Sequence, residues 1–471
     1  MDSITILGTI FKYALVALGG VAVLTLFCVL GFQTYKRLFH GTKTLLKRQW
    51  FVLILILCWY LLVLGLTAFS RGANYTGNIN FSMFSGYVNA WNKWSYTELQ
   101  LIIFNMLMFA PLGFLFPLLY NKAERFSVIC LISFLATLSI EVLQLITGRG
   151  IFEFDDLLHN FIGSIFGYFI IMFILDCLRN KKIKAKSALK MLALPFIYGV
   201  IILCAVIAYN NKDYGNLDFL PAEKQNMSVI TIENSLKLDD EVKEVSVYKN
   251  EHAYDFTYGK NISEQLEELL GLKFRKTIRT EEYNKIFEAD TSAKEQLTYF
   301  MDKGVFSYVS WEEYSKLNED KAAENRMKIE TWMKENDLFP QDAKYTLQNN
   351  EMLRWDVEYQ DVESGKSDYT YGIIMAEFTE ENHIANFDYQ IVHNKFIRKE
   401  KIISLKDAYA EILKGNFEQY IPFEKGDKLY IENCQLDYIY DTKGYYRPVY
   451  VFKGYVNNKD MSWECKISAL N

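Results

Sequence analysis

The chain has 471 residues, of which 51% are hydrophobic and 23% charged, and its formal net charge is −6. Residues 1–214 hold 18 Lys and Arg against 9 Asp and Glu, whereas residues 215–471 hold 33 against 48. An acidic second half repels phosphate, and neither half has a nucleic-acid-binding signature, so nucleic acid is excluded as a partner. A basic, apolar half followed by an acidic, tyrosine-rich half predicts a membrane domain over residues 1–210 and a soluble domain over residues 211–471.

Six apolar runs are long enough, or nearly so, to cross a bilayer, which takes about 20 residues. The predicted spans are residues 13–32, 50–69, 99–120, 126–146, 156–175 and 189–209. The predicted fold class is therefore an α-helical transmembrane bundle of about six spans, with the lipid bilayer as its surroundings, followed by a soluble α+β domain.

The connections between the predicted spans differ in charge. Residues 35–49, 121–125 and 176–188 are rich in Lys and Arg, whereas the alternate connections carry only Arg71 and Lys93 in one and Arg149 in the other. Positive loops stay in the cytoplasm. We therefore expect a multi-pass protein of the cell membrane with both termini, and the soluble domain, on the extracytoplasmic side.

Polar side chains interrupt the apolar runs, although such groups are costly in lipid and usually face a bundle interior, a partner or a pathway. Glu141 and Gln144 lie three residues apart in the fourth run, on one helical face. The predicted topology places them near the outer surface. Eight residues are predicted to form a ligand-binding site at the outer membrane face: Arg71, Asn105, Glu141, Gln144, Arg149, Asp155, Asp156 and Asn160.

Structural roles compete with this hypothesis. Asp155 or Asp156 would cap the helix of the fifth run and complement its dipole. Glu141 would form an interhelical pair with Arg71 or Arg149, and Arg149 would otherwise pair with the two aspartates at the interface.

Other polar and small residues have packing roles to weigh. Gln144 and Asn105 would bridge helices as well as contact a ligand, and His159 fits a packed interfacial residue. Gly163 and Gly167 form a small-residue face that suits close helix packing.

Catalysis and cofactors receive little support. Glu141 and Asp156 would serve as paired carboxylates in an enzyme. However, the sequence has no Ser/His/Asp or Cys/His set, no glycine-rich phosphate loop, no Cys/His metal spacing and no calcium-loop pattern. The sequence thus predicts no cofactor and no metal, and a non-enzymatic protein is favoured.

The second half alternates short apolar runs with amphipathic segments, which predicts an antiparallel sheet with helices. Expected helices are residues 262–270, 322–336 and 404–414, the last with Ser404 as N-cap. Expected strands are residues 242–248, 352–359, 369–378, 385–391, 436–440, 449–455 and 461–468, with a hairpin turn at 441–444. A split into two subdomains is expected near residue 340.

Cys434 and Cys465 are the two cysteines of the second half. If this half lies outside the cell, a disulfide between them is one possibility, and two free thiols are the other.

The polar motifs resemble a known family. Asn105-x-x-x-Phe109-x-Pro111-Leu112-Gly113, then Glu141-x-x-Gln144, then Arg149 followed by Asp155-Asp156-Leu157-x-x-Asn160-x-x-Gly163, resemble the VanZ-like membrane domain over about residues 10–180. The resemblance implies a small helical domain in the cytoplasmic membrane, typically of Gram-positive bacteria. The name-giving member is linked to low-level teicoplanin resistance. No catalytic role follows for the matching residues.

The end of the chain shows a second, weaker resemblance. Ser404–Tyr409 and the segment Gly444–Phe452 are similar to PepSY-like extracytoplasmic modules, including those of YycH/YycI-type regulators. This similarity covers about the last seventy residues and implies a binding or regulatory module.

Two functions are therefore weighed. The first is a cell-envelope accessory protein that binds a lipid-linked wall component or an amphiphilic lipoglycopeptide, and so affects teicoplanin susceptibility. The alternative is a membrane-anchored regulator or sensor whose extracytoplasmic domain binds a membrane or wall protein.

Overall fold

The computed structural model describes residues 47–69, 79–275, 279–281, 284–290, 294–358, 367–419 and 421–470. The chain divides into two compact units. The first unit contains the described residues up to Lys212 except Trp91–Trp94, and the second contains Trp91–Trp94 with the residues from Asp213 onward. The predicted span at residues 13–32 and the predicted site residue Arg71 lie outside the described residues.

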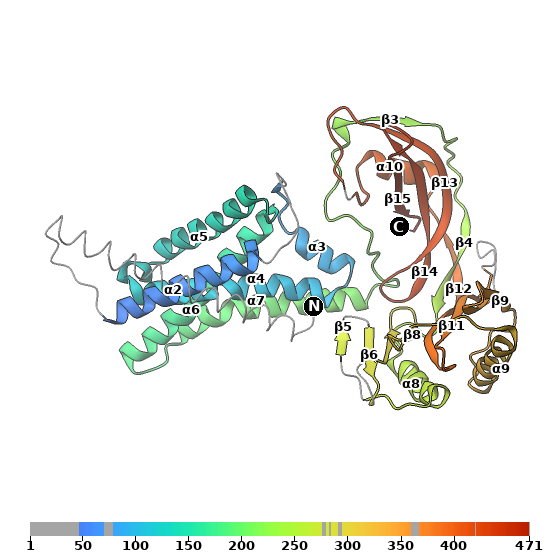
Figure 1. The fold of residues 1–471 in the computed structure, drawn as a ribbon. Coiled ribbons are helices and arrows are strands. Elements are labelled where there is room, and N and C mark those ends of the chain that lie inside the picture. Colours follow the sequence, from blue (N-terminus) through green and yellow to red (C-terminus); the bar gives the residue numbers. More distant parts are fainter. Residues whose placement is uncertain are drawn as a thin grey trace. The chain divides into compact units, whose positions relative to one another are not determined.

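Among the described residues of the first unit, five helices are long and apolar enough to cross a membrane, and they correspond to five of the predicted spans (Figure 1). They are α2 (Lys47–Leu64), which continues as the π-helical turn η1 (Gly65–Phe69), α4 (Tyr96–Leu119), α5 (Phe126–Thr147), α6 (Phe154–Asn180) and α7 (Ala185–Asn210). Large apolar side chains such as Leu107, Leu131 and Phe196 point outward. This is the pattern that lipid permits, because a bilayer core solvates apolar groups.

Helices α4 and α6 touch backbone to backbone. A Cβ atom added to Gly163 would overlap the carbonyl oxygen of Met106, and one added to Gly167 would overlap that of Ala110. Gly113 of α4 makes the reciprocal approach to the backbone of α6. The predicted packing role of Gly163 and Gly167 is confirmed.

One end of these helices is closed by a short parallel pairing of β1 (Ile79–Asn80) with β2 (Phe152–Glu153). The helix α3 (Ser85–Asn92) follows β1, within the connection between two predicted spans, where the sequence predicted no helix. The connection before α4 and the connection between α5 and α6 therefore meet at one end. The 3₁₀ turn η2 (Asn121–Glu124) joins α4 to α5 at the opposite end.

The described residues of the second unit form a single large, mostly antiparallel sheet with three α-helices, which confirms the predicted α+β class. Strands β3 and β13 are the one parallel pair in this sheet, among the residues that the structure describes. The strands are β3 (Thr231–Asn234), β4 (Glu244–Asn250), β5 (Arg279–Glu281), β6 (Asn284–Glu288), β7 (Gln296–Phe300), β8 (Val305–Val309), β9 (Lys344–Gln348), β10 (Met352–Val357), β11 (Tyr369–Phe378), β12 (Ile384–Lys401), β13 (Lys428–Tyr440), β14 (Tyr445–Val456) and β15 (Ser462–Ser468). The helices are α8 (Phe256–Leu270), α9 (Glu319–Glu335) and α10 (Leu405–Leu413).

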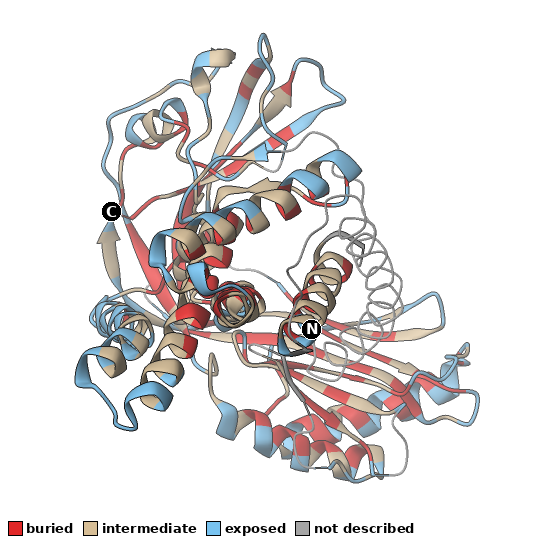
Figure 2. Cartoon of the chain, turned by 90° about the vertical axis from the view of Figure 1, so that its left-hand side faces the viewer, coloured by how far each residue is buried: buried red, intermediate tan, exposed pale blue. Residues whose placement is uncertain are grey.

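Two main hydrophobic cores lie against this sheet. In the first, α8 and α9 cover strands β6 to β8 and β10 to β12, with Trp355 and Phe306 fully buried. In the second, α10 packs with β4 and β13 to β15 around Phe417 and Phe452. Figure 2 shows the buried residues along the strands of this sheet. Residues on both sides of position 340, among them Trp332 and Leu353, contribute to the first core.

The local signals for α10 and for the β13–β14 turn are confirmed. Ser404 accepts a hydrogen bond from the backbone N–H of Asp407 at 3.1 Å and so caps α10. Asp441 accepts from the N–H groups of Lys443 and Tyr445, and Gly444 has φ = 79°, which glycine adopts without strain. The predicted hairpin at residues 441–444 therefore connects β13 to β14.

Cys434 and Cys465 are both free thiols. Each lies opposite Phe452, Cys434 on β13 and Cys465 on β15, so the whole of strand β14 separates them. Two strand spacings amount to about 10 Å, whereas a disulfide needs Cα atoms about 4.4–6.8 Å apart. The disulfide possibility is therefore wrong for this fold, and the free-thiol alternative holds.

Candidate functional site

The predicted polar residues gather at the end of the helices where β1 pairs with β2. Asn105 lies in the first half of α4, Glu141 and Gln144 in the last turns of α5, and Asp155, Asp156 and Asn160 in the first turns of α6. Glu141, Gln144 and Asn160 are 1%, 2% and 3% exposed, respectively. A carboxylate and two amides are thus held in the interior of an otherwise apolar bundle.

Asp155 holds the start of α3. It accepts hydrogen bonds from the backbone N–H of Phe84, from the hydroxyl of Ser85 at 3.0 Å and from the backbone N–H of Gly86 at 2.8 Å. The predicted structural alternative was a cap on the helix of Asp155 itself, α6, whose cap position is occupied by Glu153. Asp155 instead caps another helix, which the sequence could not show because α3 was not predicted.

Asp156 and Asn105 connect α6 to α4. The amide nitrogen of Asn105 donates to a carboxylate oxygen of Asp156 at 2.6 Å. Asp156 is half-buried, so this charge-assisted hydrogen bond is shielded from competing solvent. The bridging role that the sequence allowed for Asn105 is present.

Glu141 reaches the short β2 strand. Its Oε2 accepts the backbone N–H of Glu153 at 3.3 Å, which ties the end of α5 to the start of α6. Arg149 follows the αL residue Gly148 in the turn after α5, and its side chain is exposed. The alternative partner Arg71 lies outside the described residues.

Two buried amide oxygens accept no hydrogen bond from the described residues, and one buried ring nitrogen has no hydrogen-bond partner among them. Gln144 donates through Nε2 to the carbonyl of Thr67 at 3.3 Å, and Asn160 donates through Nδ2 to the hydroxyl of Thr137 at 3.1 Å. Their oxygens, and Nε2 of His159, remain without a partner there. A buried polar atom in this state costs about 1–3 kcal/mol, so the two amide oxygens mark a place where a hydrogen-bond donor fits.

Further residues join this cluster that the sequence did not single out. Thr137 lies four residues before Glu141 on the same face of α5. Tyr87 of α3 contacts the ring of His159 edge-on at a centroid distance of 5.1 Å and hydrogen-bonds the hydroxyl of Tyr198 on α7. Thr137 could have been predicted as a site residue, because it is polar and lies one helical turn from Glu141. Tyr87 could not, because its contact with the site depends on where α3 packs.

The first unit is thus a multi-pass membrane bundle with a polar interior at one end. The VanZ/LLP1 family model matches residues 51–175. The motif resemblance, predicted over about residues 10–180, is thus confirmed as a VanZ/LLP1 domain at residues 51–175, which supports a membrane accessory protein of the cell envelope.

Two solved structures are similar to part of the chain. One is an uncharacterized protein from Eubacterium rectale, with 12% identity over 52% of this chain and 89% of that chain, at a TM-score of 0.21. The other is the Bacillus megaterium YpeB C-terminal domain, with 11% identity over 45% of this chain and 93% of that chain, at a TM-score of 0.18. No curated protein matches the chain.

Proposed function

We propose that the polar cluster binds the hydrogen-bonding part of an amphiphilic molecule, a lipid-linked wall component or a lipoglycopeptide, at the outer face of the membrane. The observation that carries the proposal is the buried acceptor set of Glu141, Gln144 and Asn160. Two of its amide oxygens accept nothing from the described residues. Amide and hydroxyl groups of a wall precursor or a glycopeptide supply the donors that such a set selects.

The orientation in this proposal is supported by the arrangement of the connections. The end that holds the cluster is joined by residues 81–95 and 148–153, and the opposite end by η2 and residues 181–184. Lys122, Arg125, Lys181, Lys182 and Lys184 belong to that opposite end. The positive-inside rule assigns it to the cytoplasm and the cluster to the outer face.

Substitution of the cluster tests this function. We expect Glu141→Gln and Asp156→Asn to change susceptibility to teicoplanin at equal membrane abundance. The matched control is Glu124→Gln, because Glu124 is a carboxylate at the opposite end of the helices whose exposed pair with Arg179 contributes little. Susceptibility unchanged in both cluster variants would refute a glycopeptide-linked site. A lipid that co-purifies with the wild-type protein and is lost from both variants would instead support the lipid-linked ligand.

A second function is favoured by an observation in the second unit, where strand β9 pairs only with β10 among the described residues. An open sheet edge suits binding of a partner protein, which fits a membrane-anchored regulator. Deleting residues 215–471 separates the two functions. A susceptibility phenotype that survives the deletion in full contradicts the regulatory function, and one that disappears supports it.

A further inference from the structure

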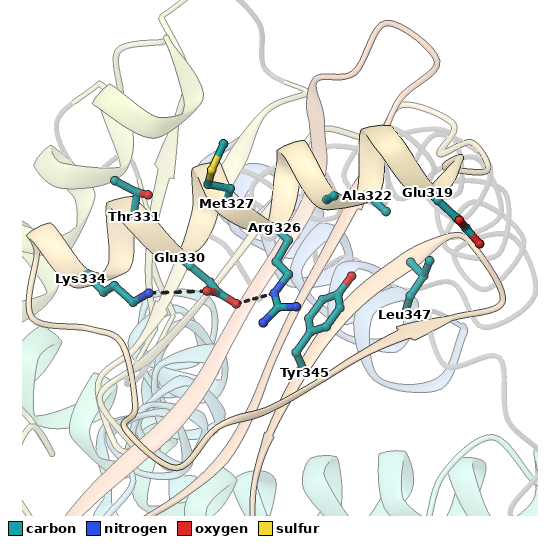
Figure 3. A pocket seen from close by; sticks show the side chains of 10 residues that line it. Glu319, Ala322, Arg326, Met327, Glu330, Thr331, Lys334, Tyr345 and Leu347 are labelled. Atoms are coloured by element: carbon teal, nitrogen blue, oxygen red, sulfur yellow. Dashed lines mark hydrogen bonds and ion pairs between the residues drawn. The ribbon is translucent and has the colours of Figure 1, made fainter.

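A groove runs between helix α9 and strand β9 in the second unit (Figure 3). Its volume is about 430 Å³, which is room for a few side chains. Ala322, Ala323 and Met327 line it from α9, and Tyr345 and Leu347 line it from β9. Met327 is 66% exposed, so its apolar side chain is accessible to a ligand in the groove.

The strand beside this groove is an edge of the sheet. In the described part of the chain, β9 forms its ladder with β10 from Lys344 to Gln348 and with no other strand. Alternate residues of an edge strand direct their N–H and C=O groups away from the ladder, where an extended peptide can pair with them. A groove between a helix and an edge strand therefore supplies main-chain hydrogen bonds along one wall and side-chain contacts along the other.

One end of the groove, around Arg326 and Lys334, presents positive charge, and the carboxylate of Glu319 lines the other end. The side chain of Glu330 is only 15% exposed and is held by Arg326 Nε at 2.7 Å and by Lys334 Nζ at 3.6 Å. Its Oε1 also accepts from the indole of Trp355 at 3.0 Å. The carboxylate is thus neutralised beneath two cations whose side chains stay about half exposed.

The guanidinium of Arg326 is held in a defined orientation. It lies over the ring of Tyr345, 4.1 Å from the ring centroid, and Figure 3 shows it between α9 and that ring. Its Nε is bonded to Glu330, and its terminal nitrogens donate to no described residue. A guanidinium that is held by stacking and still has N–H donors available is well suited to bind a carboxylate.

From this geometry we propose that the groove binds an extended peptide segment of a partner protein in which acidic and apolar residues alternate. The peptide adds as a strand to β9, its acidic side chain bonds Arg326, and its apolar side chains lie against Met327 and Leu347. This inference deepens the second proposed function, because it names the kind of partner that the second unit takes and the residues that read it.

The probe is a blocked synthetic octapeptide of alternating Val and Glu, compared with its Val and Lys counterpart, added to the full-length protein in detergent. We expect the acidic peptide to bind and to slow hydrogen exchange of the amides at residues 344–348. Arg326→Gln should weaken binding by about tenfold or more, since a charge-assisted hydrogen bond contributes at least about 1.4 kcal/mol. Binding of both peptides alike, or no protection of β9, would overturn the proposal.

Two further variants separate recognition from folding. Met327→Glu alters an exposed side chain, leaves Glu330 and its partners in place, and should abolish binding by repelling the acidic peptide. Lys328→Gln removes a cation from the same helix that does not line the groove, and should leave affinity unchanged. Equal losses in both variants would contradict the proposed site. If deletion of residues 215–471 alters susceptibility but Met327→Glu does not, the regulatory function stands and the groove proposal fails.

Discussion

Asp155 stabilises a helix that begins 70 residues before it in the sequence. Its carboxylate accepts three hydrogen bonds at the start of α3, so it acts there as an N-cap supplied from another helix. Sequence inspection identifies such a residue, because a carboxylate beside an apolar run is conspicuous. It does not identify the partner, because nothing in the local pattern links residue 155 to residues 84–86.

Replacing Asp155 by Ala should therefore release α3. The loss of a capping side chain costs about 1–2 kcal/mol, which would lower the melting temperature of the full-length protein in detergent by a few degrees. We also expect faster proteolysis between residues 79 and 92. Asp156→Asn is the neighbouring control, since the amide oxygen introduced there would still accept from Asn105 and lies outside the bonds to α3. Equal proteolysis of both variants would argue against the cap.

His252 and His393 lie together in the second unit, 5.8 Å apart between ring centroids. Burial lowers the pKa of both, and for His252 the neighbouring His393 lowers it further, although the carboxylates Glu251 and Asp255 act in the opposite direction. The unfolded chain therefore binds these protons at a higher pH than the folded one. Their contribution to stability is complete above about pH 6.5 and is lost as the pH falls below it.

This titration predicts an acid-sensitive second unit. The urea midpoint, followed by pulse proteolysis of the full-length protein, should fall as the pH is lowered from about 7.5 to about 5.5, a window that brackets the ordinary histidine pKa. His393→Gln should flatten that dependence, because it removes one partly buried titrating group. His383→Gln provides the comparison, since His383 is exposed. A slope that stays the same in the His393 variant would show that other groups govern the acid response.

At the scale of elements, the contact between α4 and α6 depends on the absence of side chains. Gly163→Ala places a methyl group where the carbonyl oxygen of Met106 lies, so the two helices must separate. Overpacking of this kind costs about 1–3 kcal/mol, and thermal unfolding in detergent should register it. Gly199→Ala on α7 is the matched control, because an added Cβ meets nothing within 4 Å there. Similar destabilisation by both variants would contradict the packing argument.

The β13–β14–β15 ladder predicts inert cysteines. Burial raises the pKa of Cys434 to about 12 and also raises that of Cys465. At about pH 8 the thiolate population of Cys434 is about a thousandfold below that of an ordinary cysteine, and iodoacetamide should react correspondingly slowly. Lys459→Cys, in an exposed turn, sets the rate of an accessible thiol. Mass spectrometry that detects rapid alkylation of Cys434, or a cross-link between Cys434 and Cys465, would oppose this arrangement of strands.

Long elements were predictable from the sequence and short ones were not. The described membrane helices, α10 and strands β10, β11, β14 and β15 follow from sustained periodicity, and the ends of α9 shift by only a few residues. Helix α8 begins six residues before its predicted start, and the predicted strands covered only residues 385–391 of β12 and 436–440 of β13. Strands β3 and β5 to β9 were not predicted, because runs of three to five residues carry too few apolar positions to set a period. Strands β6 to β9 are held in the sheet by packing into the core of α8 and α9, whereas β3 pairs with β13 beside the core of α10.

For the whole molecule, the sequence predicted two parts of opposite charge because lipid and water select different compositions. The sequence predicted that the site residues lie at one end of the bundle from the order of the spans alone, because successive connections between membrane spans lie on opposite sides of the membrane. The sequence could not predict the contacts between helices in the site. Asp155 accepts hydrogen bonds from the start of α3, and Thr137 accepts one from Asn160.

Orientation in the membrane is the prediction at this scale. In intact cells, a membrane-impermeant maleimide should label Lys459→Cys and spare Lys182→Cys until the cells are permeabilised, because the basic connection around residue 182 is expected in the cytoplasm. Both positions are exposed in the structure, so access depends on the side of the membrane. Labelling of residue 182 in intact cells would invert the topology and place the polar cluster on the inner face.

The strand that separates Cys434 from Cys465 has a consequence for how the second unit matures. Because no disulfide bond forms between these two cysteines, the sheet folds without thiol oxidases or disulfide isomerases. Dithiothreitol should leave its melting behaviour untouched. On either side of the membrane, this region would retain its shape whatever the local redox potential.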